Sequence, residues 1–251
     1  MAIFFTQGQS KLYPTVPALI TDAVRDDVMS MSHRNDAFQK LFQSTVEGLK
    51  ALLGIPGGYH IFFLGSATEA MERVIQNCVE RESLHLVNGS FSEKFHTTAA
   101  ALGKKALKAD GTTVASLSAS APAGVELIAY TQNETSTGIA VPVELIHEAG
   151  RRHPEKLIAV DIVSSAPSVP LDFSLVDAVF FSVQKGFGLP AGLGVMIVSP
   201  RAMEKAHSVK ERGMNVSWYH SFGELEKYAA KSQTPETPNV LGMYLLGNVV
   251  K

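Results

Sequence analysis

The segment HIFFLGSATEAMERVIQNCV, residues 60–79, contains the junction that decides the fold class. Its first part, HIFFL, is an apolar run of strand length that ends at Gly65 and Ser66. Ser66 and Glu69 have the S-x-x-E spacing of a capping box, which predicts a helix that runs to about Val79. A buried strand that turns directly into a helix is typical of an α/β protein.

The same alternation of short apolar runs and longer amphipathic ones extends in both directions along the chain. Residues 35–53 predict a helix, because apolar side chains recur there at helical spacing before Gly54 and Pro56. Residues 109–124, rich in Ala, Ser, Thr and Gly, are expected to form an exposed connection. We predict further strands at 84–87, 126–131, 157–161, 178–183 and 194–198, and further helices at 90–102, 143–152, 200–208 and 221–231. The pattern therefore predicts an α/β fold with a mainly parallel sheet flanked by helices.

Composition and charge exclude several classes of protein. Of the 251 residues, 45% are hydrophobic and 18% are charged, which excludes an intrinsically disordered chain. The formal net charge of −2 gives no reason to expect a nucleic-acid partner. The single cysteine, Cys78, excludes an internal disulfide and fits a reducing compartment. Because the sequence has neither a membrane-length apolar run nor a secretory signal, we expect a cytoplasmic protein without a membrane partner.

Three places in this pattern have residues suited to chemistry. At the helix start, the backbone N–H groups of Ala67 and Thr68 should point outward at the positive end of the helix dipole, which suits a phosphate. Asp161 ends an apolar strand, at the sheet edge where α/β proteins bind ligands. Lys185 follows another apolar strand, so partial burial should lower its pKa and favour a nucleophilic amine.

Each feature taken alone has a simpler alternative: an ordinary capped helix, a turn aspartate and a solvent-exposed loop lysine. The glycines of residues 186–192 precede a strand rather than a helix, so they do not form a dinucleotide-binding loop. The histidines of residues 147–153 do not have the spacing of a zinc protease, and no cluster of His and Cys predicts a metal site.

A series of short motifs gives the chain a family resemblance. They are SHR at 32–34, GSATEAMERV at 65–74, NGSF at 88–91, QNETSTGI at 132–139, DIVSS at 161–165, SVQKGFGLPAG at 182–192 and TPN at 237–239. The sequence resembles the class V aminotransferases, pyridoxal-phosphate enzymes of fold type I, and among these the phosphoserine aminotransferases. The resemblance implies an N-terminal arm at 1–15 and a cofactor-binding large domain at 16–251, with the smaller C-terminal domain of the family absent from this chain.

The resemblance also implies roles around the cofactor ring. Lys185 matches the lysine that bonds to the cofactor aldehyde and then carries the proton, and Asp161 matches the aspartate that pairs with the pyridine nitrogen. Phe91 and Val163 match the side chains on the two faces of the ring. Thr135 matches the residue that hydrogen-bonds the ring hydroxyl.

Further matches concern phosphate groups. The cofactor phosphate is expected on the backbone of Ala67 and Thr68, with a side-chain donor from Gln184. Thr237 matches a residue that reaches the cofactor phosphate of the neighbouring subunit, which implies a homodimer with shared sites. His33 and Arg34 match a pair that binds the substrate phosphate across the interface, where a guanidinium offers a bidentate fork.

The chain departs from the phosphoserine aminotransferases at three of these places. Thr68 stands where many of them have arginine, Phe91 where tryptophan is common, and Glu236 where a neutral asparagine is usual. A carboxylate beside a phosphate is unfavourable unless it turns away.

The resemblance implies amino transfer between small amino acids and 2-oxo acids. The expected reaction converts 3-phosphohydroxypyruvate and glutamate into phosphoserine and 2-oxoglutarate, in serine biosynthesis. Two alternatives stay open: another class V enzyme, such as a serine–pyruvate or alanine–glyoxylate aminotransferase, and a non-catalytic cofactor-binding fragment. A cysteine desulfurase is disfavoured, because Cys78 lies within a predicted helix rather than on a mobile loop.

Overall fold

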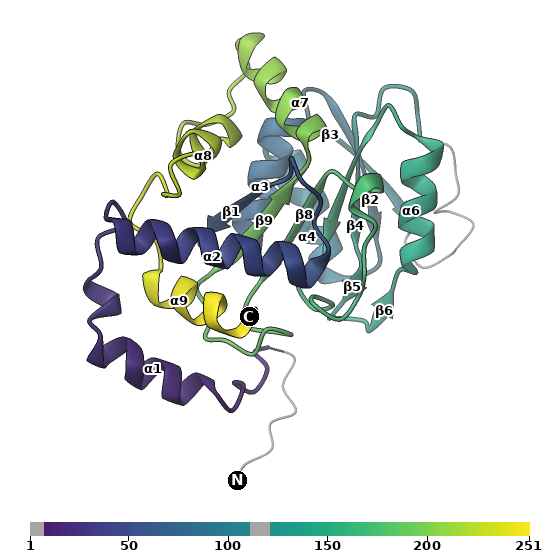
Figure 1. Ribbon diagram of the computed structural model, residues 1–251. Helices are drawn as coiled ribbons and strands as arrows, with labels where there is room; N and C mark the ends of the chain where they lie inside the picture. Colours follow the sequence, from purple (N-terminus) through teal and green to yellow (C-terminus); the bar gives the residue numbers. More distant parts are fainter. Residues whose placement is uncertain (1–7, 111–120) are drawn as a thin grey trace.

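A seven-stranded sheet with helices on both faces forms the centre of the molecule (Figure 1). The computed structural model describes residues 8–110 and 121–251. The sheet has the order β1-β9-β8-β7-β4-β2-β3. Its strands are β1 (His60–Leu64), β2 (Glu82–Val87), β3 (Lys105–Asp110), β4 (Leu127–Thr131), β7 (Leu157–Asp161), β8 (Ala178–Ser182) and β9 (Gly194–Val198). Two short strands, β5 (Asn133–Glu134) and β6 (Ile139–Ala140), pair separately.

Strand direction brings the functional segments to one edge of this sheet. β9 is antiparallel to its neighbours β1 and β8, whereas the pairs β8–β7, β7–β4, β4–β2 and β2–β3 are parallel. The carboxyl ends of β1, β2, β4, β7 and β8 therefore point the same way, and the turns that follow them meet at that edge. The predicted α/β architecture with a mainly parallel sheet is confirmed.

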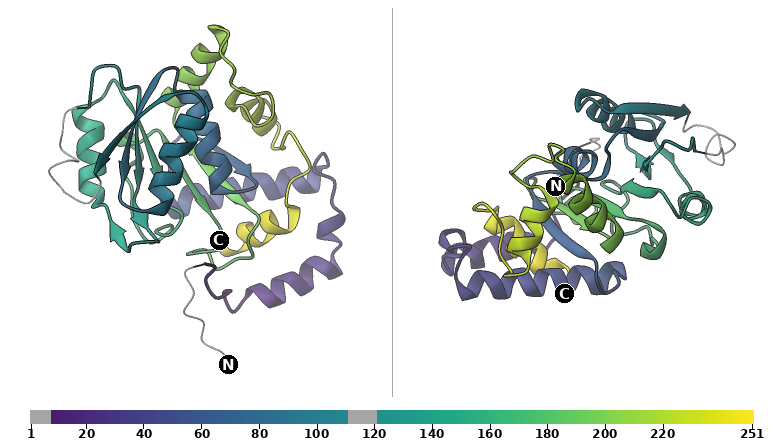
Figure 2. Two further views of the ribbon diagram at one scale, coloured as in Figure 1. Left: turned by 180° about the vertical axis from the view of Figure 1, so that it is seen from behind. Right: turned by 90° about the horizontal axis from the view of Figure 1, so that it is seen from above.

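Two layers of helices cover the sheet, as the views in Figure 2 show. On one side of the sheet lie α2 (Asp36–Leu53) and α6 (Val143–Arg152), with α9 (Val240–Val249) packed on α2 and α1 (Val16–Arg25) packed on α9. The other packs against α3 (Ala67–Cys78), α4 (Ser90–Ala101), α7 (Pro200–Glu211) and α8 (Phe222–Ala229). Short 3-10 turns occur at Val28–Ser30 and Phe173–Leu175. Among the helices of the described residues, none is long and apolar enough to cross a membrane.

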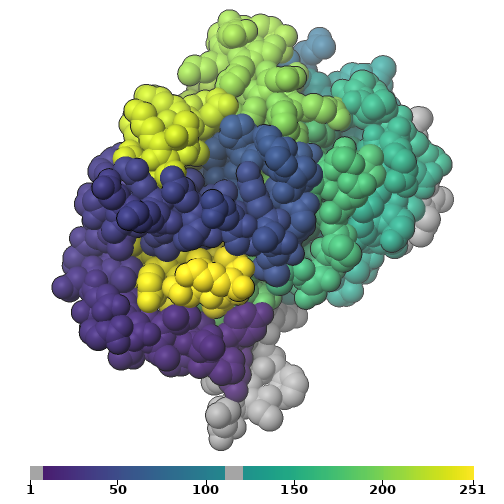
Figure 3. Space-filling model, in the orientation of Figure 1, coloured from purple at the N-terminus to yellow at the C-terminus, as the bar shows by residue number. Residues whose placement is uncertain are grey.

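The last helix, α9, has an apolar sequence that is buried between other helices. Helix α9 lies between α1 and α2, as the yellow segment of Figure 3 shows. Met243, Leu245 and Leu246 on this helix are fully buried. Burying such side chains contributes about 1.5–3 kcal/mol each, so α9 fastens the two N-terminal helices to the core.

The structure departs from the predicted elements in a few places. β3 was not predicted, because it is an edge strand whose half-exposed sequence KALKAD has no clear apolar face. The expected connection at 109–124 was therefore wrong at its first two residues, and its residues 111–120 lie outside the described part. Helix α1 was not predicted either, and α7 runs three residues further than expected, to Glu211.

A close approach of two segments requires glycine at the start of β9. A Cβ on Gly194 would lie 2.5 Å from the carbonyl carbon of Ser66, closer than two nonbonded carbons can come. Gly194 therefore lets β9 pass directly beside the residue that caps α3, which keeps the start of that helix at the edge of the sheet.

Candidate functional site

A cavity of about 340 Å³ opens at the carboxyl edge of the parallel strands. It is lined by Gly8, Gln9, Ser66, Ala67, Thr68, Met71, Phe91, Asp161, Val163, Ser182, Gln184 and Lys185. A smaller adjoining hollow shares Phe91, Asp161, Val163 and Lys185 and adds Thr131, Asn133, Thr135 and Ser164. Eight of the residues singled out from the sequence thus meet in one place, although they come from five different turns.

Lys185 reaches the floor of this cavity from the turn after β8. Its Nζ donates a hydrogen bond to Thr135 Oγ1 at 2.9 Å and lies 5.3 Å from the ring centre of Phe91. Burial lowers the pKa of the Lys185 amine, against the opposing pull of the Asp161 and Glu134 carboxylates. The partial burial and lowered pKa predicted for Lys185 are found, and its role as a nucleophile stays a prediction.

The turn that carries Lys185 is held in place by the N-terminal segment. Ser10 donates from its backbone N–H to the Gln184 carbonyl and from its hydroxyl to the Lys185 carbonyl, at 2.9 and 2.5 Å. Tyr13 donates its hydroxyl to the Gly186 carbonyl at 2.6 Å. These contacts fix the backbone on both sides of the lysine, and the sequence had given no sign of them.

Asp161 lies at the end of β7 with only 3% of its surface exposed. Its Oδ1 accepts a hydrogen bond from the Val163 N–H at 2.8 Å. Burial raises the pKa of Asp161 to about 7, although this hydrogen bond opposes the change. A buried carboxyl with so little compensation is suited to a ligand that brings a protonated nitrogen.

Phe91 covers one side of the cavity from the first turn of α4. Phe91 is 37% exposed and lines the cavity, where an aromatic ring can meet a planar ligand. The turn is fixed by Glu134, whose fully buried carboxylate accepts the N–H groups of Phe91 and Ser92 at 3.0 and 2.9 Å. A Cβ on Gly89 would lie 2.4 Å from Glu134 Cγ, which explains the glycine of the NGSF motif.

The start of α3 differs from the sequence expectation in its hydrogen bonds. Ser66 Oγ accepts the N–H of Glu69, but Glu69 Oε2 accepts from Gly65 instead of from Ser66. The N–H of Ala67 is not free, because it donates to Ser182 Oγ at 2.9 Å. Within the described residues the N–H of Thr68 has no partner, so this helix start offers one open amide and the Ser182 hydroxyl proton.

Gln184 adds an unsatisfied polar group beside this helix start. Its Oε1 is buried and lacks a hydrogen-bond partner among the described residues. The oxygen and nitrogen of an amide exchange places by a flip, so Gln184 can present its NH₂ group to an anion in the cavity. Ser182 was missed by the sequence interpretation, because a serine at the end of an apolar strand carries no distinct signal.

His33, Arg34 and Thr237 lie away from this cavity. Arg34 donates to Gln233 Oε1 and to the carbonyls of Thr234 and Pro235, at 2.8–3.0 Å. Burial, followed by the charge of Arg34, lowers the pKa of His33.

Thr237 lines a separate hollow of about 150 Å³ together with Glu69 and Glu236. Glu236 turns to His220, whose Nε2 lies 2.6 Å from Glu236 Oε2. Within residues 8–110 and 121–251, no group of three or more His, Cys, Asp or Glu could hold a metal ion.

Comparison with known proteins identifies the family of the chain. The family described as "Aminotransferase class-V" matches residues 18–251 of this chain. The chain belongs to the class V aminotransferases. The family resemblance and the fold class predicted from the motifs are thereby confirmed.

Several class V proteins show how far the similarity of this aminotransferase chain extends. A phosphoserine aminotransferase from Rhodococcus opacus is 31% identical over 252 residues, covering 98% of this chain and 65% of the relative. The crystal structure of a phosphoserine aminotransferase from Cytophaga hutchinsonii is 43% identical with a TM-score of 0.95, covering 99% of this chain and 70% of that one. An alanine–glyoxylate aminotransferase from Nostoc sp. is 26% identical with a TM-score of 0.78, covering 97% and 65%. The chain spans about 65% of the length of the curated relatives it matches.

Proposed function

We propose that this chain is the cofactor-binding part of a pyridoxal-phosphate-dependent phosphoserine aminotransferase. The reaction would transfer the amino group of glutamate to 3-phosphohydroxypyruvate, giving phosphoserine and 2-oxoglutarate. The observation that carries this proposal is the convergence of Lys185, Asp161 and the start of α3 in one cavity. The 43% identical phosphoserine aminotransferase from Cytophaga hutchinsonii supports the substrate class.

The residues of the cavity suit the two charged ends of pyridoxal phosphate. Asp161 would pair with the ring nitrogen, since its buried carboxyl otherwise has a single N–H partner. The open N–H of Thr68, the hydroxyl of Ser182 and the amide of Gln184 would hold the phosphate. Phe91 would cover one face of the ring.

Two further cavity residues complete the ring contacts and the covalent link. Val163, on the edge of the same cavity, would pack on the opposite face from Phe91. Thr135 lies within hydrogen-bond distance of the Lys185 amine and would meet the ring hydroxyl. Lys185 would bond to the cofactor aldehyde.

When bound, the cofactor supplies an electron sink for negative charge that develops on the substrate Cα. Lys185 then acts as general base and acid, because its Nζ takes the Cα proton and later returns it. Burial lowers the pKa of this amine, which favours its neutral, proton-accepting form. Thr135 holds that amine at 2.9 Å, so the proton carrier starts from a defined position.

The positions of His33, Arg34 and Thr237 support a homodimer with shared sites. All three lie outside the cavity of their own chain, and Arg34 and Thr237 are exposed. Residues that serve the site of a second copy are expected to have this placement. In the proposed dimer, Thr237 would contact the neighbouring cofactor phosphate, and His33 with Arg34 would bind the substrate phosphate.

A second candidate is a serine–pyruvate or alanine–glyoxylate aminotransferase. The similarity to the Nostoc alanine–glyoxylate enzyme favours it. The Arg34 guanidinium also donates three hydrogen bonds within its own chain, which leaves fewer donors for a substrate phosphate. The two candidates differ in the amino donor. Phosphoserine and alanine, each mixed with the cofactor-loaded protein, would separate them by which one shifts the cofactor absorption faster.

Cofactor trapping tests the proposal directly. We expect pyridoxal phosphate to give a yellow absorption band with the protein, and borohydride to fix the cofactor on the peptide that contains Lys185. The Lys231→Ala variant, changed at an exposed lysine, should be labelled as the parent protein is. A folded protein that gives no band would favour a fragment that does not bind the cofactor, and a label on another lysine would refute the site assignment.

A further inference from the structure

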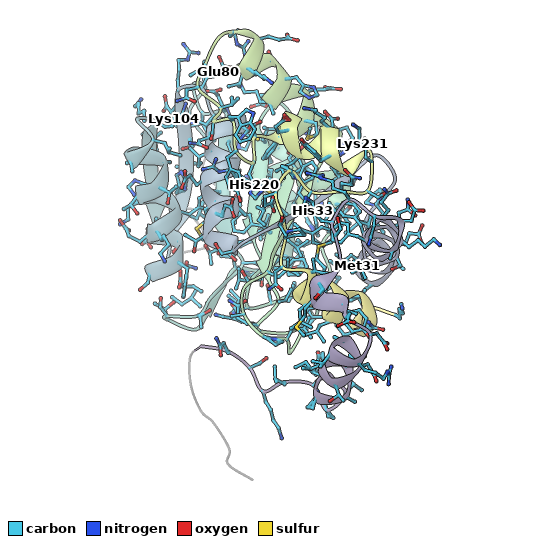
Figure 4. All side chains as sticks on the ribbon, turned by 90° about the vertical axis from the view of Figure 1, so that its left-hand side faces the viewer. Met31, His33, Glu80, Lys104, His220 and Lys231 are labelled. Atoms are coloured by element: carbon cyan, nitrogen blue, oxygen red, sulfur yellow. The ribbon has the colours of Figure 1, made fainter. Side chains whose placement is uncertain are left out.

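A buried histidine joins the start of α3 to the segment that carries Thr237. His220 follows the turn after α7, and its side chain has no exposed surface. Its Nδ1 lies 2.5 Å from Glu69 Oε1, and its Nε2 lies 2.6 Å from Glu236 Oε2. Figure 4 labels His220 and His33 near each other in its view.

The geometry favours a charged imidazole. Each ring nitrogen faces a carboxylate oxygen, and a carboxylate only accepts hydrogen bonds. A neutral histidine has one N–H, so one of its nitrogens would present a lone pair to an anion. The doubly protonated ring donates to both carboxylates, and the three side chains form a charge-assisted bridge of Glu69, His220 and Glu236.

Both ends of this bridge belong to segments that the proposed function uses. At one end, Glu69 Oε2 accepts the N–H of Gly65, directly before the Ser66 cap of α3. At the other end, Glu236 precedes Thr237, and the Thr234 hydroxyl donates to the Glu236 carbonyl at 2.7 Å. The bridge therefore connects the helix start beside the cavity with the residue expected at the neighbouring subunit's phosphate.

The backbone and its neighbours hold His220 in this position. His220 has a φ of 54°, in the left-handed region that residues with a Cβ rarely adopt. Its ring stacks on Tyr219 at 3.8 Å, and the Tyr219 carbonyl accepts Arg73 Nη1 at 2.9 Å. A disfavoured backbone conformation persists where the surrounding contacts determine it, and here those contacts orient the imidazole between the two acids.

We propose that His220 is a positioning residue that sets the phosphate contacts of two active sites at once, through Glu69 in its own subunit and through Glu236 and Thr237 in the neighbouring one. This inference rests on the proposed function. It also accounts for the carboxylate at 236, which contacts the imidazole of His220.

The test compares pyridoxal phosphate with pyridoxal, which lacks the phosphate. For the His220→Gln protein we expect the dissociation constant of pyridoxal phosphate to rise about tenfold, in the range of one lost charge-assisted hydrogen bond, with that of pyridoxal unchanged. The Glu236→Gln variant, which keeps the bridge to Glu69, should change in the same direction. The matched control is His207→Gln, which removes an exposed histidine paired with Glu226 at 2.9 Å and should leave both constants unchanged.

A pH series separates positioning from general stability. Burial alone would lower the pKa of His220, but its hydrogen bonds with Glu236 and Glu69 raise it to about 9. The ratio of the two dissociation constants measures the preference of the protein for pyridoxal phosphate over pyridoxal. In the parent protein this preference should decrease as the pH rises through about 9, and in His220→Gln it should not change with pH. Titration of Lys185 and Asp161 affects both ligands and cancels in the ratio.

Other titratable groups lie around the bridge, and burial raises the pKa of Tyr219, which stacks on the imidazole, so its hydroxyl stays protonated through pH 9. Arg73 on α3 and Glu72 beside it are paired, and the pKa of Glu69 is lowered by its hydrogen bonds from His220 and Gly65 despite its burial. His33 faces Glu236 and has a lowered pKa, so it is neutral well below pH 9.

The outcomes are distinguishable. If the parent protein forms no adduct with pyridoxal phosphate, the proposed function fails. If it does form one and His220→Gln weakens both ligands equally, or neither, the positioning role is refuted while the proposed function stands. Should His220→Gln fail to fold, Glu236→Gln and the pH series of the parent protein decide the question.

Discussion

Lys185 Nζ donates a hydrogen bond to Thr135 Oγ1 at 2.9 Å, although 50 positions of sequence separate the two residues. Lys185 follows β8 and Thr135 follows β4, and β7 lies between those strands in the sheet. Asp161, at the end of β7, is therefore placed between them. The hydrogen bond joins the segments that follow β8 and β4 across the end of β7. It holds the amine beside the cavity in the absence of a ligand.

Replacing Lys185 with alanine should remove covalent cofactor binding and leave the fold intact. The amine makes one hydrogen bond to a side chain and pays a desolvation cost, so its loss is expected to change the free energy of unfolding by less than about 1 kcal/mol. Borohydride trapping and urea unfolding measure the two effects. A variant that still carries a borohydride-stable label would contradict the role of Lys185, whereas Lys231→Ala should be labelled normally.

Asp161→Asn should stabilise the cofactor-free protein at pH 8. Because burial raises the pKa of Asp161 from 3.8 to about 7, the folded state binds its proton more tightly than the unfolded state does. Ionisation above pH 4 thus opposes folding, by up to about 4 kcal/mol at pH 8. Asparagine avoids this cost and keeps the oxygen that accepts the Val163 N–H.

Thermal unfolding without cofactor measures this effect. The melting temperature of Asp161→Asn should exceed that of the parent protein at pH 8, and the difference should shrink as the pH falls towards 4. Amino transfer should slow in the same variant, because the carboxylate for the ring nitrogen is lost. Equal melting temperatures at all pH values would show that the buried carboxyl carries no such cost.

Glu134→Gln should destabilise the protein. Glu134 Oε2 accepts the N–H groups of Phe91 and Ser92, and Oε1 accepts the N–H and hydroxyl of Ser136, so the single oxygen of an amide can serve only one of these two sets of donors. Leaving buried donors unpaired costs about 1–3 kcal/mol, to be measured by urea unfolding. Glu211→Gln, at an exposed position, serves as the control and should unfold as the parent does.

The protein should lose stability as the pH rises through about 9. The pKa of His220 is raised from 6.5 to about 9, so its charged form stabilises the folded state fully below pH 6.5, by about 3 kcal/mol, and this contribution disappears above pH 9. Melting temperatures between pH 6 and 10 should fall across this window. His220→Gln should melt lower at pH 7 and lack this pH step, and an identical step in the variant would assign it to another group.

Local patterns were sufficient to predict most elements of this fold. The strand at 60–64, the cap at Ser66 and the helix after it follow from neighbouring residues, because burial periodicity and capping act over a few positions. The motifs also indicated most of the cavity residues. The edge strand β3 escaped prediction, since its pairing with β2 rather than its own sequence stabilises it.

The sequence by itself determined the α/β class, the family and the residue types of the candidate site. Only the tertiary structure decided that the Ala67 N–H donates to Ser182 and that the Phe91 N–H donates to Glu134. It also decided that His220 bridges Glu69 and Glu236. Each of these contacts joins segments that the strand order and the packing of helices bring together. Hydrogen bonds and pKa values depend on such distances in space, whereas sequence patterns report mainly which residues are neighbours along the chain.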